Sequence, residues 1–149
     1  MRPAVAALLV AVPLAAAADD LPPPVAAAIA EVEAACGSAP ATLDPFVIDR
    51  QDVNGDGVPD FILNVGGLRC GDEEVSQCGL MGCPKIVLAS SKNGFVLVLD
   101  IYAHDLRFRA LNGRPAASAN DEGWNCGSVR RGPGRTTFLW DGTRFACAE

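Results

Sequence analysis

Six cysteines constrain the fold of this 149-residue chain more than any other feature. An even number of cysteines in an exported chain predicts a set of disulfides. The short stretch Cys78-Gly-Leu-Met-Gly-Cys83 contains two glycines that let the chain turn back, which favours a bridge between its ends. A C-terminal hairpin would bring Cys126 beside Cys147, and Cys36 and Cys70 then remain for each other. We therefore expect three disulfides with these pairings.

Zinc is the alternative use of these cysteines. The sequence has no Cys-x-x-Cys spacing, and its only histidine, His104, is far from any cysteine pair along the chain. Zinc sites usually show such spacings, and thiols are oxidised outside the cytoplasm. We expect neither a thiolate metal site nor a free catalytic cysteine.

The N-terminus has the pattern of an export signal. Arg2 precedes an apolar run over residues 4–12, and small residues at 15–18 precede Asp19-Asp20. This order is typical of a signal peptide over residues 1–18, cleaved after Ala18. A membrane anchor is the alternative, but a spanning helix needs about 20 apolar residues and this run is shorter. We expect a periplasmic or secreted protein whose mature chain, residues 19–149, is a single domain without a transmembrane segment.

The charge of the expected mature chain is acidic and uneven. Removal of Arg2 changes the net charge from −6 to −7; residues 19–74 carry −10 and residues 75–149 carry +3. Mixed surface charge is ordinary, and an anion-binding face in the second half is the alternative. The acidic total and the exported location argue against nucleic acid as a partner.

The remaining pattern predicts one helix followed by strands. Val25, Ile29, Val32 and Cys36 share one helical face after three prolines, and Gly37 follows as a C-cap. Eight apolar or alternating stretches predict strands, namely 46–50, 61–65, 85–89, 95–102, 106–110, 114–119, 136–140 and 143–147. The expected fold class is mainly β: an antiparallel meander of about eight short strands with one N-terminal helix, in a disulfide-stapled single domain.

Several turns in this pattern are predicted from residue type. Asn93-Gly94 and Asn112-Gly113 are expected hairpin turns, and Asp141-Gly142 is expected to form a two-residue type I′ turn. Pro115 lacks a backbone N–H, so the strand over residues 114–119 is expected to lie at a sheet edge or to be irregular.

The stretch "DVNGDGVPDFIL", residues 52–63, is the main candidate for a site. Ca²⁺ binds six to eight oxygens at about 2.3–2.6 Å, and acidic loops supply them at alternating positions. The loop over residues 52–60 has such oxygens at Asp52, Asn54, Asp56 and Asp60, with the Val58 carbonyl between the last two. A polar turn that binds nothing is the alternative, because Asp, Asn and Gly also favour turns.

Position 12 of this loop is Leu63 instead of the bidentate Glu of a helix–loop–helix site, and strand-like residues flank the loop on both sides. The stretch resembles the FG-GAP/VCBS repeats of integrin-type propellers and bacterial surface proteins, with matches at Asp52, Asn54, Asp56, Gly57 and Asp60. The resemblance covers one loop and implies a local calcium-binding hairpin with the ligands named above. "CGLMGCPKIVL" and "WDGTRF" also resemble segments of small uncharacterised exported bacterial proteins, which imply no activity.

Other candidate groups lack a supporting motif. His104 beside Asp105 has no Gly-x-Ser-x-Gly elbow to complete a triad. The remaining candidates are an acidic run that could act on glycosides, two tryptophans that could stack on sugars and three arginines that could bind anions: Asp72, Glu73, Glu74, Trp124, Trp140, Arg130, Arg131 and Arg135.

We therefore expect a non-catalytic binding or envelope-interaction domain with one structural calcium ion and a protein or glycan partner. The alternative is a small cell-envelope hydrolase that uses His104 or the acidic loop.

Overall fold

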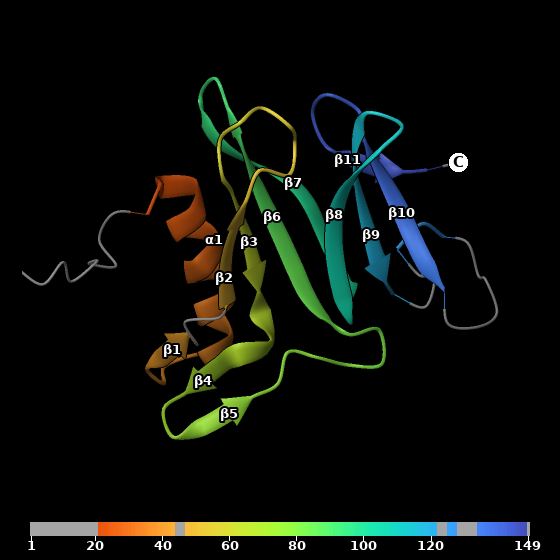
Figure 1. Ribbon diagram of the computed structural model, residues 1–149. Helices are drawn as coiled ribbons and strands as arrows, with labels where there is room; N and C mark the ends of the chain where they lie inside the picture. Colours follow the sequence, from red (N-terminus) through yellow and green to blue (C-terminus); the bar gives the residue numbers. More distant parts are fainter. Residues whose placement is uncertain (1–20, 44–46, 122–124, 128–133, 149) are drawn as a thin grey trace, which may run out of the picture.

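The computed structural model describes residues 21–43, 47–121, 125–127 and 134–148 (Figure 1). The expected signal peptide, residues 1–18, lies outside them. The first sheet has the order β2-β3-β6-β7, with β2 Ile48–Gln51, β3 Asp60–Asn64, β6 Cys83–Ser91 and β7 Gly94–Ala103. The second has the order β11-β10-β9-β8, with β8 Asp105–Leu111, β9 Arg114–Asn120, β10 Arg135–Trp140 and β11 Phe145–Cys147. A small third sheet has the order β1-β4-β5, with β1 Ala41–Leu43, β4 Leu68–Cys70 and β5 Glu73–Val75.

The helix and the second sheet cover opposite faces of the first sheet (Figure 1). Helix α1, Pro23–Glu33, contributes Val25 and Ile29 to a core with Phe61, Leu63 and Leu88 of β3 and β6. The other face of the same strands packs against the second sheet in a larger core: Val53, Ile62, Val87, Ala89, Val98, Leu99, Ile101, Ala103, Ala117, Ala119, Phe138 and Phe145. Because β3 and β6 are covered on both faces, their sequences are almost continuously apolar instead of alternating.

The helix begins and ends at residues that the sequence singles out. Prolines occupy its first turn, where the missing N–H removes no helical hydrogen bond. A short 3₁₀ turn, η2 Ala34–Cys36, continues it, and Gly37 adopts φ +60° and ends it. Val25 and Ile29 are buried as expected, whereas Val32 lines a groove described below.

The three predicted disulfides are formed: Cys36–Cys70, Cys78–Cys83 and Cys126–Cys147. The first ties the end of the helix to β4. The second closes a small loop in which Gly82 lies against the backbone of Ala103 and His104, so that an added Cβ would come within 2.1 Å of a backbone atom. The third joins β11 to the segment after β9. Each of the three layers is therefore tied covalently to a neighbouring segment.

The predicted fold class is confirmed, with about eleven strands instead of eight. All pairs of strands in the described residues are antiparallel. The strands that the sequence did not predict are β1, β4 and β5, which have three residues each. β1 and β4 alternate apolar and polar residues, but three residues are too few to stand out as a strand pattern, and β5 begins with two exposed glutamates.

Pro115 is not at a sheet edge, because β9 lies between β8 and β10. Pro115 pairs with Ala110 of β8, whereas the pairing with β10 starts only at Ala116, so β10 requires no N–H at this position. Asn112 and Gly113 both have positive φ, and they form the predicted turn.

Two other turns lie one residue away from their predicted centres. Ser91 pairs with Gly94, so Lys92 and Asn93 lie between β6 and β7. Trp140 pairs with Phe145, so the last hairpin has a four-residue connection over residues 141–144 instead of a two-residue turn. Asp141 accepts hydrogen bonds from the backbone N–H of Arg144 and from the hydroxyl and backbone N–H of Thr143, and these lower the pKa of this carboxyl to about 2.

Within the described residues, no helix is long and apolar enough to cross a bilayer.

Candidate functional site

Asp60 anchors the acidic loop to the core. Its side chain is fully buried, and its two carboxylate oxygens accept the backbone N–H of Val53 at 2.8 Å and of Ser90 at 2.7 Å. Ser90 lies on β6, so this carboxylate joins the start of the loop to a neighbouring strand. Two N–H donors to an ionised acceptor offset part of the cost of burying it.

Asp52 organises the loop's turn. Its Oδ1 accepts the N–H of Gly55 at 2.7 Å, and its Oδ2 accepts the N–H of Gly57 at 2.8 Å. Both glycines have φ above +80°, a backbone conformation that residues other than Gly rarely adopt. The Gly residues of the motif are therefore explained by the turn itself.

Asp56 connects the tip of the loop to β6. Its Oδ1 accepts the Val58 N–H at 2.8 Å, and its Oδ2 accepts the Ser90 hydroxyl and the Asn54 side-chain amide. These hydrogen bonds, above all the one from Ser90, lower the pKa of this exposed carboxyl. The described residues provide no ion pair to Lys or Arg for Asp52, Asp56 or Asp60.

The structure thus brings Asp52, Asn54, Asp56 and Val58 together in one exposed turn and places Asp60 in the core beneath it. In this arrangement the carboxylate oxygens accept hydrogen bonds, mostly from backbone N–H groups. Among the described residues, no three His, Cys, Asp or Glu side chains converge as a ready-made metal site. The calcium site stays a prediction.

His104 and Asp105 each contact other residues, with no hydrogen bond or ion pair between them. The His104 Nε2 lies 3.1 Å from the carbonyl oxygen of Leu80, in the loop closed by Cys78–Cys83. Asp105 forms ion pairs with Arg107 and Arg135 at 3.1 Å each. The hydrogen bond from Arg135 is the main reason that the pKa of the Asp105 carboxyl is lowered.

The other sequence candidates occupy structural or exposed positions. Arg135 also donates to the Ser118 hydroxyl and carbonyl, which ties β10 to β9. Trp140 packs beside Phe145, with ring centroids 5.2 Å apart, at the margin of the larger core. Asp72, Glu73 and Glu74 are exposed around the β4–β5 turn. Trp124, Arg130 and Arg131 lie outside the described residues.

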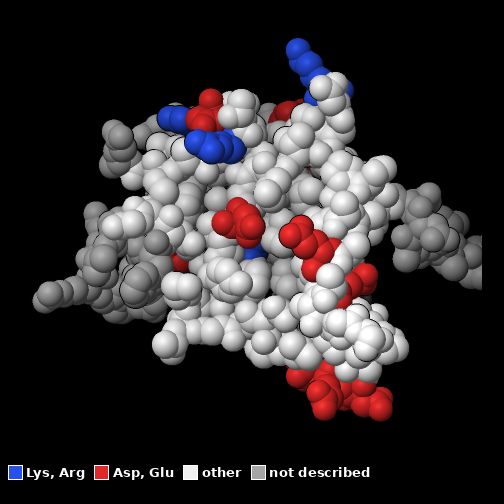
Figure 2. Space-filling model, turned by 180° about the vertical axis from the view of Figure 1, so that it is seen from behind, with Lys and Arg blue, Asp and Glu red and all other residues white. Residues whose placement is uncertain are grey.

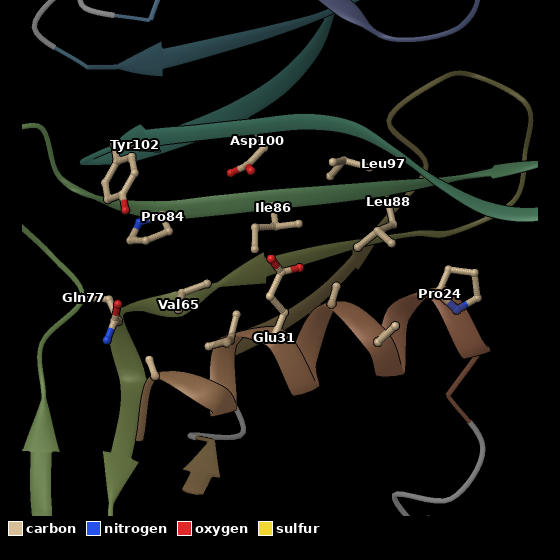
Figure 3. Close-up of a pocket in the computed structure, with 14 residues that line it drawn as sticks. Pro24, Glu31, Val65, Gln77, Pro84, Ile86, Leu88, Leu97, Asp100 and Tyr102 are labelled. Carbon is tan, nitrogen blue, oxygen red and sulfur yellow. The ribbon is translucent and has the colours of Figure 1, made fainter. Parts of the chain in front are cut away.

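A groove runs between α1 and the first sheet (Figure 3). Its volume is about 600 Å³, and Val32, Val65, Ile86, Leu88 and Leu97 are among the apolar side chains that line it. Two carboxylates also line it: Glu31 from the helix and Asp100 from β7 point toward the space between them (Figure 3).

These two acids were not singled out from the sequence. Partial burial is the main cause that raises the pKa of Asp100, and the charge of Glu31 raises it further. Neither acid has an ion-pair partner among the described residues. The signal for Asp100 was present, since it is the only charge in the apolar strand "FVLVLDIY".

The molecule also has a broader electrostatic asymmetry. In the view from behind, acidic side chains gather near the middle of the face and at its lower edge, whereas most of the visible Lys and Arg surface lies at the upper edge (Figure 2). A cation approaching the middle of this face therefore meets mainly negative charge.

Comparison with known proteins gives no relative: no protein-family model, curated protein or solved structure matches this chain.

Proposed function

We propose that this protein is an exported, non-catalytic binding domain of the cell envelope, and that its loop over residues 52–60 holds a structural calcium ion. The groove between α1 and β7 supports the binding role, because it combines an apolar lining with two carboxylates that have no cationic partner in the described part of the chain. Concave apolar sites with a few polar groups are the usual form of a binding pocket.

The three disulfides support the exported location. The bridged cysteines are between 5 and 34 positions apart in the sequence, and no cysteine among the described residues is free. Such bridges persist in oxidising compartments, so a periplasmic or secreted location is the natural one.

The uncompensated charge of the loop supports the calcium ion. Asp52 and Asp56 carry two negative charges on one exposed turn, with no Lys or Arg paired to either in the described residues. Asp52 Oδ2 and Asp56 Oδ1 each accept one hydrogen bond and keep a second lone pair, whereas Asp52 Oδ1 and Asp56 Oδ2 already accept two hydrogen bonds each. Calcium would be held by Asp52, Asn54, Asp56 and the Val58 carbonyl, with Asp60 contributing from below. Competition with backbone N–H donors and the absence of a Glu at position 12 predict weak affinity, with Kd of about 10⁻⁴–10⁻³ M.

The calcium ion is tested by thermal melting of residues 19–149 in calcium and in chelator. Calcium at about a hundredfold excess over Kd should stabilise the fold by about 2.7 kcal/mol. Asp56→Ala should abolish this rise, whereas Asp141→Ala should keep it, because Asp141 caps a turn outside the loop. Magnesium should substitute poorly, since it demands a tighter octahedral site. Identical melts of the wild type in calcium and chelator would show that the loop is only a hydrogen-bonded turn.

The binding role is tested by co-sedimentation with isolated bacterial envelopes. Ala27 is exposed and lines the groove, so Ala27→Trp should fill it and prevent retention. Ala26→Trp is the matched control, because Ala26 is exposed on the same helix but does not line the groove. Equal retention of the two variants would contradict binding through the groove. Release of soluble fragments from peptidoglycan, lost in His104→Ala, would favour a hydrolase instead.

A further inference from the structure

Strand β7 is the exposed edge of the first sheet. It is ten residues long, and β6 is its only partner strand in the described residues. Val96, Leu97 and Tyr102 on this strand are 43%, 57% and 45% exposed. A long edge with apolar side chains offers free N–H and C=O groups to another extended chain.

The free backbone groups can be assigned from a proline. Tyr102 pairs with Pro84, which has no N–H, so this pair cannot exchange the two hydrogen bonds of a bonded pair. Hydrogen-bonded and non-bonded pairs alternate along two antiparallel strands. The backbone N–H and C=O of Ile101 therefore bond to β6, and those of Asp100 and Tyr102 point away from β6. The side-chain amide of Asn125 donates to the Tyr102 carbonyl at 2.9 Å, which agrees with this direction and occupies that carbonyl. The outward groups left for a partner strand are therefore the N–H and C=O of Asp100 and the N–H of Tyr102.

Two cavities flank this edge. The groove beside α1 lies on one side (Figure 3), and a second cavity of about 450 Å³ lies on the other, lined by Phe138 and Phe145 of the second sheet and by the polar side chains of Asn125 and Arg144. Leu97 and Asp100 line both. A strand laid along β7 would direct alternate side chains to opposite faces, one set into each cavity.

The two carboxylates in the groove beside α1 favour a cationic ligand. Asp100 and Glu31 face each other across Ile86 (Figure 3), and the partial burial that raises the pKa of Asp100 also makes its charge costly without a counter-ion. The surrounding lining is apolar and suits the methylene stem of a lysine or arginine.

We propose that β7 binds an extended segment of a partner protein by strand addition, with a lysine or arginine of that segment placed between Asp100 and Glu31 and apolar side chains in the cavity toward Phe138. This inference deepens the proposed binding function and rests on it, but it does not depend on calcium. Backbone hydrogen bonds give such complexes affinity, and the pockets for alternate side chains give specificity.

A second copy of the chain fits this edge less well. The sequence of β7, "GFVLVLDIYA", has no basic residue, so pairing of two β7 strands supplies no cation and adds a second Asp100. Like charges across a pair of strands are destabilising.

The test uses the folded, oxidised chain over residues 19–149 and fluorescence anisotropy at low salt. The probe is a labelled peptide of about nine residues that alternates threonine and valine, with lysine at its centre. One control peptide has glutamate at the centre, and another is N-methylated on alternate amides. We expect the lysine peptide to bind at least about tenfold more tightly than either control, and salt to weaken it.

Protein variants separate charge from structure. Asp100→Asn with Glu31→Gln should reduce affinity for the lysine peptide by about tenfold or more. Glu33→Gln is the matched control, because Glu33 is on the same helix but does not line the groove, and it should bind as the wild type does. Circular dichroism confirms that each variant is folded.

Three results would overturn the proposal: equal binding of the lysine and glutamate peptides, unchanged affinity in the double variant, or no binding of the lysine peptide. A dimer of the free protein that Tyr102→Pro dissociates would also overturn it, by assigning the edge to a second copy. Retention on envelopes that depends on Ala27, without binding of the lysine peptide, would remove this inference and leave the binding function standing.

Discussion

Removing the Asp60 carboxylate should destabilise the protein more than removing any other acid of the loop. Asp60→Ala leaves the N–H groups of Val53 and Ser90 without their acceptor. The Val53 side chain is 3% exposed and the Asp60 side chain is fully buried, so water reaches this site poorly. A hydrogen bond to a charged group contributes about 1.5–3 kcal/mol, so the loss of two should cost about 3–6 kcal/mol.

The assay is urea unfolding of residues 19–149 in chelator, followed by circular dichroism. With an m-value of about 2 kcal/mol/M, the midpoint should fall by about 2 M. Asp60→Asn keeps one acceptor oxygen and should lose about half as much. Asp49→Ala is the control: among the described residues this exposed carboxylate on the neighbouring strand β2 accepts one hydrogen bond, from the Asn64 side chain at 2.8 Å, and attracts the charge of Lys85, so its loss should cost less than that of Asp60. If Asp60→Ala loses no more than Asp49→Ala, the carboxylate does not anchor the loop.

Two further predictions concern the disulfides and Asp100. From sequence separations of 34 and 5, the chain-entropy model assigns about 4 kcal/mol to Cys36–Cys70 and about 2 kcal/mol to Cys78–Cys83. Serine at both positions of the first pair should therefore lower the melting temperature more than serine at both positions of the second, and the reverse order would contradict this ranking. Because the folded-state pKa of Asp100 is raised, its charge destabilises the fold above that pKa, and the cost disappears as pH falls below the unfolded value of about 3.9. Asp100→Asn should thus raise the free energy of unfolding at pH 7 by a few tenths of a kcal/mol, because this side chain is exposed, and with it the melting temperature. Near pH 3 the substitution should have no effect. An equal effect at both pH values would show that the charge of Asp100 does not destabilise the fold.

Local rules of chain geometry made much of the fold predictable. The disulfides follow from spacing and from the hairpin that carries Cys147, and the helix follows from the position of its prolines and from Val25 and Ile29. Pro115 shows where such a rule fails. A proline at the end of a central strand avoids its penalty when the pairing with one neighbour starts only after it, and that register is set by tertiary contacts.

The candidate site was only partly predictable for a similar reason. The spacing of the acids shows that they share one loop, but it does not show that Asp60 turns into the core while Asp52 and Asp56 stay at the surface. The groove requires α1 to lie over β6 and β7, so Glu31 and Asp100, 69 positions apart in the sequence, meet only in the folded chain.

Asp100 has two physical effects at the same edge of the sheet. A charge within an apolar edge strand discourages pairing with a second copy, and the β-bulge between Val87 and Leu88 adds local twist that has the same effect. The same charge favours a segment that brings a cation, because only such a segment relieves the repulsion from Glu31. An edge with no charge would bind any extended apolar chain, including its own. If β7 binds a partner strand as proposed, Asp100 beside Glu31 would both disfavour pairing with a second copy and favour a segment that carries a cation.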